Sequence, residues 1–173
     1  PPINQIRHIH GALTITDNLF TNMEGAFANL VQNDGNIQIK SNIHVASMNG
    51  AFPQLQSMSG QLVVHANLGL TTLGNAFPLL PLIMNPYETA LQITDNPRLT
   101  TLGTSFNSLR QIFGKIDIRN NPSLQNFEAL RNLECHGGIR HNNATEYCDN
   151  CPDWLVNLQA CPTSEESGSG DGD

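Results

Sequence analysis

The chain has 173 residues, the length of one domain, and only 13% of them are charged. The formal net charge is −7, but four acids lie among the last nine residues, so the rest carries 8 − 11 = −3. A chain without a basic patch is a poor partner for nucleic acid or an acidic membrane surface, and no apolar run of about 18 residues is present to span a bilayer. It begins at Pro1 without a methionine, so we expect a mature product or an excised fragment.

A short phrase recurs along the chain with a period of 24 to 29 residues. It reads Gly-x-Leu/Ile-x-Ile/Val-x-x-Asn, and the intervals between its asparagines are 42 − 18 = 24, 67 − 42 = 25, 96 − 67 = 29 and 121 − 96 = 25. A period in this range is typical of a solenoid. Because solenoids mostly bind or build, we expect no enzyme activity and no cofactor.

Two histidines precede the first repeat. His8 and His10 are two residues apart, so on a strand they share a face and would provide half of a metal site. The sequence shows no carboxylate or third ligand that repeats beside them, so we interpret them as two surface histidines and predict no metal site.

Each repeat contains a five-residue segment in which apolar residues alternate with polar ones. These segments are 12–16, 36–40, 61–65, 90–94 and 115–119. Period-two alternation predicts strands with one buried face, which stack as a parallel sheet along one side of the coil. On the back of the coil we expect short strands or a single helical turn. Two inward columns would fill the core: Met23, Met48, Leu73 and Leu102, and Phe27, Phe52, Phe77 and Phe106.

The outward positions of the predicted sheet form three columns. The first is Ala12, Asn36, Gln61, Ala90 and Lys115; the second is Thr14, Gln38, Val63, Gln92 and Asp117; the third is Thr16, Lys40, His65, Thr94 and Arg119. Charge is sparse in the first four repeats. Two interpretations stay open: a flat docking surface for protein or glycan, or an outer sheet face that is merely polar.

The recurring asparagines follow the strands directly. They are Asn18, Asn42, Asn67, Asn96 and Asn121. Asparagine tolerates the unusual backbone angles of a tight corner and bonds its own backbone. Repeated at one corner, the side chains would stack as a structural ladder that satisfies backbone groups no sheet can pair.

The 29-residue interval contains an insertion at 81–88. Its two prolines and its aromatic residue predict a loop that bulges from the coil, either as a tolerated insertion or as a contact loop.

The repeat fades after residue 134, which divides the chain into a solenoid at 1–134, a cysteine-rich cap at 135–162 and an acidic Gly/Ser tail or linker at 163–173. The cap contains one predicted short helix at 152–158, capped by Asn150. It also contains an N-glycosylation sequon at Asn143. The sequon, the even number of cysteines and the scarcity of lysine indicate an oxidising, extracellular or cell-surface location.

The four cysteines of the cap are Cys135, Cys148, Cys151 and Cys161. Three disulfide pairings are open. We predict Cys135–Cys151 and Cys148–Cys161, with a bond between Cys148 and Cys151 the least expected. The alternative is zinc, with His136 or His141 nearby, although the usual two Cys-x-x-Cys knuckles are missing.

The repeat resembles the receptor L domain, which is related to leucine-rich repeats. The best match is Ile112-Phe113-Gly114-Lys115-Ile116-Asp117-Ile118-Arg119-Asn120-Asn121-Pro122-Ser123-Leu124, and the resemblance covers Ile6 to Cys135. It implies a mainly β fold, a right-handed parallel β-helix of about five to six turns, an extracellular location and a role in binding. It carries over no ligand-contact residues. The chain departs from the family in lacking a cysteine-bearing N-terminal cap.

Two functions follow as expectations. The first is a structural subunit that assembles with copies of itself into an oligomer, filament or surface layer, because its first turn looks uncapped and open strand edges recruit other chains. The alternative is a ligand-binding module of a receptor or adhesion protein that uses the exposed sheet face. Both are non-enzymatic interactions at the cell surface.

Overall fold

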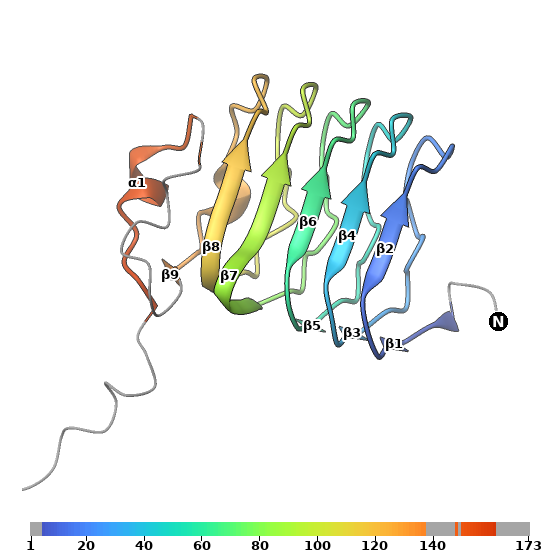
Figure 1. Cartoon of the computed structure of the whole chain (residues 1–173), viewed down its shortest axis with the longest axis horizontal. Coiled ribbons are helices and arrows are strands. Elements are labelled where there is room, and N and C mark those ends of the chain that lie inside the picture. The colour runs from blue at the N-terminus through green and yellow to red at the C-terminus, as the bar shows by residue number, and fades with distance from the viewer. Residues whose placement is uncertain (1–4, 138–147, 149, 162–173) are drawn as a thin grey trace, which may run out of the picture.

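The computed structural model describes residues 5–137, 148 and 150–161, which coil into a parallel β-solenoid of about five turns (Figure 1). We call each turn a rung. The larger sheet contains, in spatial order, β2 (Leu13–Thr16), β4 (Ile37–Lys40), β6 (Leu62–His65), β7 (Leu82–Thr94), β8 (Gln111–Arg119) and β9 (Cys135–His136). The smaller sheet contains β1 (His8–Ile9), β3 (Gln32–Asn33) and β5 (Ser57–Met58). The predicted fold class and the five predicted strands are confirmed.

Every pair of neighbouring strands is parallel, and equivalent residues of successive rungs face each other. Leu13 pairs with Ile37, Ile37 with Leu62, and Leu62 with Leu91. A third side of the coil is held by single bridges between Asn22, Ser47, Thr72, Thr101 and Asn126. The back therefore consists of short strands and turns, with one 3-10 helix, η2 (Glu128–Leu130), as the repeat pattern predicts.

The interior is filled by stacked identical or similar side chains. The rings of Phe27, Phe52, Phe77 and Phe106 stack nearly parallel, with centroids 4.9, 5.0 and 5.8 Å apart. Met23, Met48, Leu73 and Leu102 form the second buried column. Each aromatic pair adds about 1 kcal/mol beyond its burial, so the phenylalanine column favours successive rungs in this register.

The asparagines of the five corners form a continuous buried ladder. Each of the first four asparagines donates from its backbone N–H and from its side-chain Nδ2 to Oδ1 of the asparagine in the next rung, at 3.0 to 3.3 Å. From Asn42 onward, Nδ2 also donates to a strand carbonyl of the preceding rung, such as Ile15 O for Asn42. One amide thus satisfies backbone groups of adjacent rungs that the sheets leave unpaired.

The unusual backbone angles of these corners do not belong to the ladder asparagines, contrary to the prediction. They belong to the residue before each one: Asp17, Ser41, Ala66, Asp95 and Asn120 have φ between 54° and 59°. Ser41 and Ala66 gain little locally from this conformation, which costs of order 1 kcal/mol per residue. The hydrogen bonds of the adjacent asparagine hold the corner in place.

One glycine before a strand is required by close packing of the backbone. A Cβ on Gly35 would lie 2.7 Å from the carbonyl carbon of Gly11 in the preceding rung. No side chain fits at that separation, so the glycine that opens the repeat phrase at this position is required by the close contact between the backbones of adjacent rungs.

The insertion at 81–88 forms a bulge, but within a strand and not as a separate loop. From Leu82 onward these residues belong to β7, which pairs with β8 and shifts register between Met84 and Thr89 and between Thr89 and Leu91. Residues 85–88 lie opposite the single residue Gly114, and the strand pairs with β8 again from Thr89 onward.

The cap is held by two disulfides, Cys135–Cys161 and Cys148–Cys151. The predicted pairing is therefore wrong, and so is the zinc alternative for these thiols, since none of them is free. The helix α1 (Asp153–Val156) is shorter than predicted, and its N-cap residue is Pro152 instead of Asn150. Asn143, His141 and the tail at 163–173 lie outside the described residues.

The local disulfide has a structural reason. Cys148 pairs with Ile118 of the preceding rung, and Asn150 repeats the positive φ of Asn120. Cys148 and Cys151 thus occupy the positions that Ile118 and Asn121 have in the preceding rung, where both residues are buried. The Cα atoms of Cys148 and Cys151 are 5.6 Å apart. At this sixth corner Cys151 takes the place of a ladder asparagine, and its disulfide with Cys148 replaces the hydrogen bonds of the ladder.

We expect Asn67→Ala to lower the free energy of unfolding by about 3 kcal/mol, because it leaves the buried Asn42 N–H and Ile39 carbonyl without partners. Asn18→Ala, at the half-buried end of the ladder, should cost about 1 kcal/mol. Urea unfolding of the two variants measures the difference. Equal losses would contradict the role of the ladder.

Candidate functional site

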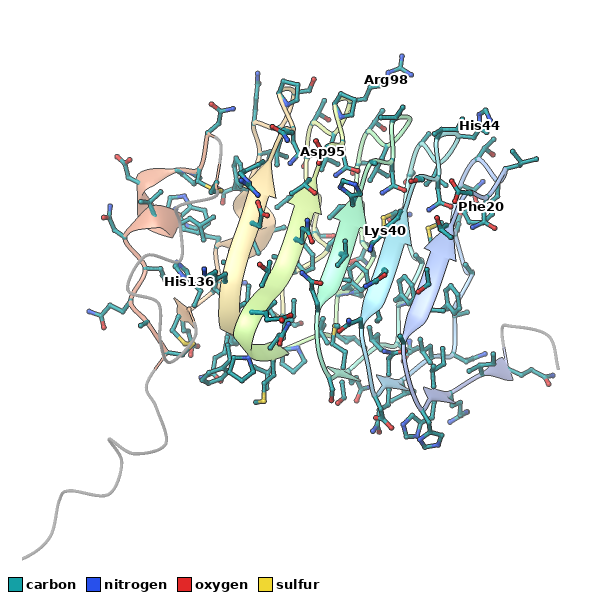
Figure 2. The ribbon with its side chains drawn as sticks, in the orientation of Figure 1. Phe20, Lys40, His44, Asp95, Arg98 and His136 are labelled. Atoms are coloured by element: carbon teal, nitrogen blue, oxygen red, sulfur yellow. A yellow bond between two sulfur atoms is a disulfide. The ribbon has the colours of Figure 1, made fainter. Side chains whose placement is uncertain are left out.

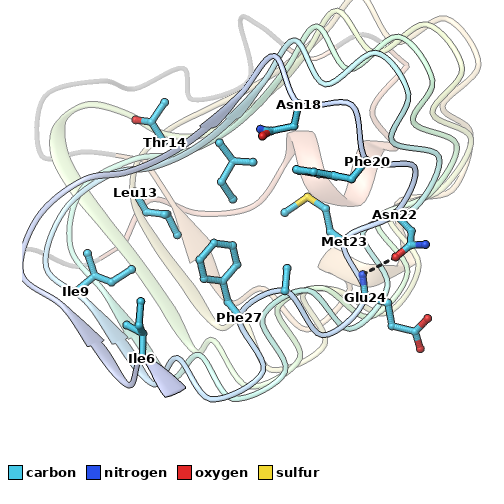
Figure 3. Close-up of a pocket in the computed structure, with 12 residues that line it drawn as sticks. Ile6, Ile9, Leu13, Thr14, Asn18, Phe20, Asn22, Met23, Glu24 and Phe27 are labelled. Carbon is cyan, nitrogen blue, oxygen red and sulfur yellow. Dashed lines mark hydrogen bonds between the residues drawn. The ribbon is translucent and has the colours of Figure 1, made fainter. Parts of the chain in front are cut away.

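The N-terminal rung has an open apolar end. A cavity of about 550 Å³ opens there, lined by Ile6, Ile9, Leu13, Phe20, Met23 and Phe27 among others (Figure 3). Phe20 points into this cavity and is 39% exposed, and Leu19 beside it is 81% exposed. Internal rungs bury the corresponding positions more completely: Leu13 is half-buried, whereas Ile37, its partner in the next rung, has no exposed surface. The end surface is therefore a core layer without a cover from the described residues.

Polar groups at the same end also lack partners. Asn18 donates to Asn42 and to the carbonyl of Thr16, but its own Oδ1 accepts no hydrogen bond from the described residues. Within the described part of the chain, β2 is hydrogen-bonded on one side, to β4, and β1 on one side, to β3. The first rung thus offers the groups that each later rung uses to bind its predecessor.

The opposite end of the coil is covered. Leu155 of α1 is buried in the hydrophobic core, and Trp154 and Leu158 pack against it. The guanidinium of Arg131 lies 4.9 Å from the Trp154 ring centroid. The two ends of the solenoid therefore differ: one is sealed by the disulfide-linked cap, and the other presents apolar side chains and strand edges.

The predicted sheet face is only partly available for contact. Val63, Thr94 and Asp117 are buried, with 2%, 3% and 7% of their surface exposed, although their positions in the pattern predict exposure. Arg119 lies against Asp117 and donates two hydrogen bonds of 2.7 and 2.9 Å to its carboxylate. Thr14 and Thr16 are exposed, and Gln38, Lys40, Gln92, His65 and Arg119 are half-buried.

The polar groups of this face largely bind one another. The hydroxyl of Thr94 lies 2.9 Å from His65 Nδ1 and accepts from Gln92 at 3.3 Å. His65 also lies 3.2 Å from the carboxylate of Asp95 (Figure 2). A partner docking here would have to displace these contacts, so the face fits a polar outer sheet better than a bare docking platform.

A cluster of three metal-ligating side chains lies on the outer face of the smaller sheet. His8 Nε2 and His10 Nδ1 are 2.7 and 3.1 Å from the same oxygen, Asp34 Oδ2. Asp34 also accepts a hydrogen bond from Gln32 at 2.7 Å. Hydrogen bonds from Gln32 and His8 lower the pKa of the Asp34 carboxyl below its usual value.

Asp34 was not predicted as the third member of this cluster. It is not beside the histidines in the sequence, and only the repeat period relates it to them. Asp34 follows His10 by 34 − 10 = 24 residues, which is one rung. Across parallel strands in register, that interval places the two side chains next to each other.

His136 is buried under the cap (Figure 2). Its Nε2 lies 3.1 Å from the carbonyl of Leu155, while Nδ1 has no hydrogen-bond partner among the described residues. Burial lowers the pKa of the imidazole below its usual value, and the bond to Leu155 opposes this only in part. A neutral imidazole that donates from Nε2 fits this position.

No protein-family model, curated protein or solved structure matches this chain. Within the described residues, no helix has the length and apolar character needed to cross a membrane. The two disulfides are consistent with an oxidising compartment.

We expect the stability of the chain to fall as the pH drops from 7.5 to 5, in part because of His136. An unfolded histidine titrates near pH 6.5, and the folded pKa of His136 is lower. The unfolded state therefore binds more protons between these two values, and stability is lost as the pH falls through that window.

His136→Gln, which keeps a donor but does not titrate, should show a smaller drop over this range in urea unfolding. Other histidines contribute to both proteins alike, so the difference isolates His136. An identical pH dependence would show that protonation of this side chain does not oppose folding.

Proposed function

We propose that this chain is a non-enzymatic interaction module that self-associates through its N-terminal rung. The observation that supports the proposal is the combination, on one end surface, of an apolar cavity with a ladder acceptor and strand edges that have no partner among the described residues. Strand edges of this kind pair with other chains unless they are covered.

The chemistry of the end surface favours a β-solenoid rung as its occupant. A second rung brings a strand edge for β2 and apolar side chains that extend the Met23 and Phe27 columns. A small ligand would fill the cavity but would leave the edge of β2 unpaired. Charge complementarity would contribute little to binding a charged partner, because Glu24 is the single charged residue among the described residues that line the cavity.

A second copy of this chain supplies such a rung. The sealed C-terminal end offers no equivalent surface, because α1 covers the last core layer. The contact is then between two N-terminal rungs, with β2 of one copy antiparallel to β2 of the other. Such an isologous contact closes as a dimer, whereas the head-to-tail contact expected from the sequence would continue into a filament.

The proposal includes an extracellular or cell-surface setting, which the disulfides support. The relationship to receptor L domains belongs to the proposal as well, supported by the parallel β-solenoid and the repeat phrase. Ligand capture on the larger sheet is the competing function. Its strongest support is the exposure of Thr14 and Thr16, since the other residues of the predicted binding face are half-buried or buried.

We expect the 173-residue chain to sediment as a concentration-dependent dimer, and Phe20→Asp to shift it to monomer by at least tenfold in the dissociation constant. The substitution places a charge in the apolar contact. Sedimentation equilibrium over a dilution series measures the shift.

Ile43→Asp is the matched control, because Ile43 is an exposed apolar side chain on the next rung, 50% exposed, outside the end surface. It should leave the dimer unchanged. A wild-type chain that stays monomeric at all concentrations would overturn self-association, and equal effects of the two substitutions would move the contact away from the N-terminal rung.

A further inference from the structure

We infer that His8, His10 and Asp34 bind a divalent transition-metal cation, with zinc as the reference ion. The three residues lie on the outer face of the first two rungs, away from the end cavity, so this inference does not depend on the proposed self-association. Among the residues that the structure describes, they are the only group of three or more such side chains whose ligand atoms come together.

The backbone places the three side chains on one surface. His8 pairs with Gln32 and Ile9 with Asn33 in parallel register, and Asp34 N–H donates to the Ile9 carbonyl at 2.8 Å. Residues two apart on a strand share a face, so His8 and His10 stand beside Gln32 and Asp34. His8 lies in β1, and His10 and Asp34 directly follow β1 and β3, so two paired strands position the donor set.

The distances suit a small cation after minor side-chain adjustment. Zinc bonds to imidazole nitrogen and carboxylate oxygen are about 2.0 to 2.2 Å, so ligand atoms of a tetrahedral site are roughly 3.3 Å apart. Asp34 Oδ2 is 2.7 and 3.1 Å from the two histidine nitrogens, and all three ligand atoms lie within 4.8 Å of one another. The side chains of His8 and His10 are 34% and 79% exposed, so both imidazoles have room to rotate toward this separation.

The donor types select the class of ion. Two imidazoles and one carboxylate suit zinc, copper, nickel or cobalt, whereas magnesium and calcium prefer oxygen donors. Gln32 holds the second oxygen of Asp34 at 2.7 Å, the type of outer contact that orients a ligating carboxylate.

Three protein ligands leave at least one coordination position for water or an external donor. His10 has 79% of its side chain exposed, so the ion reaches the site directly from solvent. The histidines belong to the first rung and Asp34 belongs to the second, so a bound ion would link the two rungs.

The same geometry also arises without a metal, when a protonated histidine pairs with the carboxylate. A metal and a proton compete for the same nitrogens, and this competition separates the two cases. Metal binding to imidazole releases protons, so it weakens as the pH falls.

The test is isothermal titration of the 173-residue chain with zinc chloride at pH 7.5, repeated at pH 5.5. We expect one saturable site whose affinity falls at least tenfold at the lower pH. His8→Ala and the nearly isosteric Asp34→Asn should each weaken binding at least tenfold. With cobalt as the probe, the visible absorption of the bound ion should disappear in both variants.

Two matched variants serve as controls. His44→Ala removes an exposed histidine at a corner (Figure 2), and His65→Ala removes the histidine of another histidine–carboxylate pair. Both should bind zinc like the wild type. Circular dichroism confirms that each variant is folded. The inference is overturned if no saturable binding occurs, or if His8→Ala and Asp34→Asn bind as tightly as the controls.

Discussion

The buried asparagine ladder is the interaction on which the rest of the solenoid depends. A parallel coil pairs its strands with those of neighbouring rungs, but at each corner the chain turns and leaves N–H and carbonyl groups inside without sheet partners. Each such group costs about 1 to 3 kcal/mol if it stays unpaired, a large share of a domain stability of 5 to 15 kcal/mol. An asparagine amide has both donors and an acceptor, so one side chain per rung satisfies its own corner and the next.

The ladder explains where the chain tolerates irregularity. Asn67 and Asn96 are 29 residues apart, yet their hydrogen bonds, at 3.0 and 3.3 Å, match those of the 24- and 25-residue rungs. The extra residues lie within β7, where a register shift disturbs pairing only locally. An insertion between strand and asparagine would separate the amide from its partners, so the corners keep a constant length.

The sequence predicted what repeats, since period and alternation report the strands, the core columns and the ladder. It failed where one copy differs from the others. Cys148 and Cys151 form a sixth corner that no longer reads as the repeat phrase, so their bond looked improbable. Val63, Thr94 and Asp117 are buried although they stand on the outer side of the sheet, which a column of residue types does not reveal. Asp34 was missed because contacts across rungs appear only when the period is applied to residues outside the phrase.

The first rung is the point at which the ladder, the end surface and the metal cluster meet. Among the residues that the structure describes, Asn18 has no preceding ladder partner, and β1 and β2 each pair with a strand on one side. This rung therefore opens more easily than internal rungs, since local stability follows buried contacts and paired backbone groups. A dimer contact on the end surface and a cation bridging β1 and β3 would both stabilise the ordered rung. Ligands that stabilise the same ordered state favour each other's binding, so the two proposals, though tested independently, predict positive coupling if both hold.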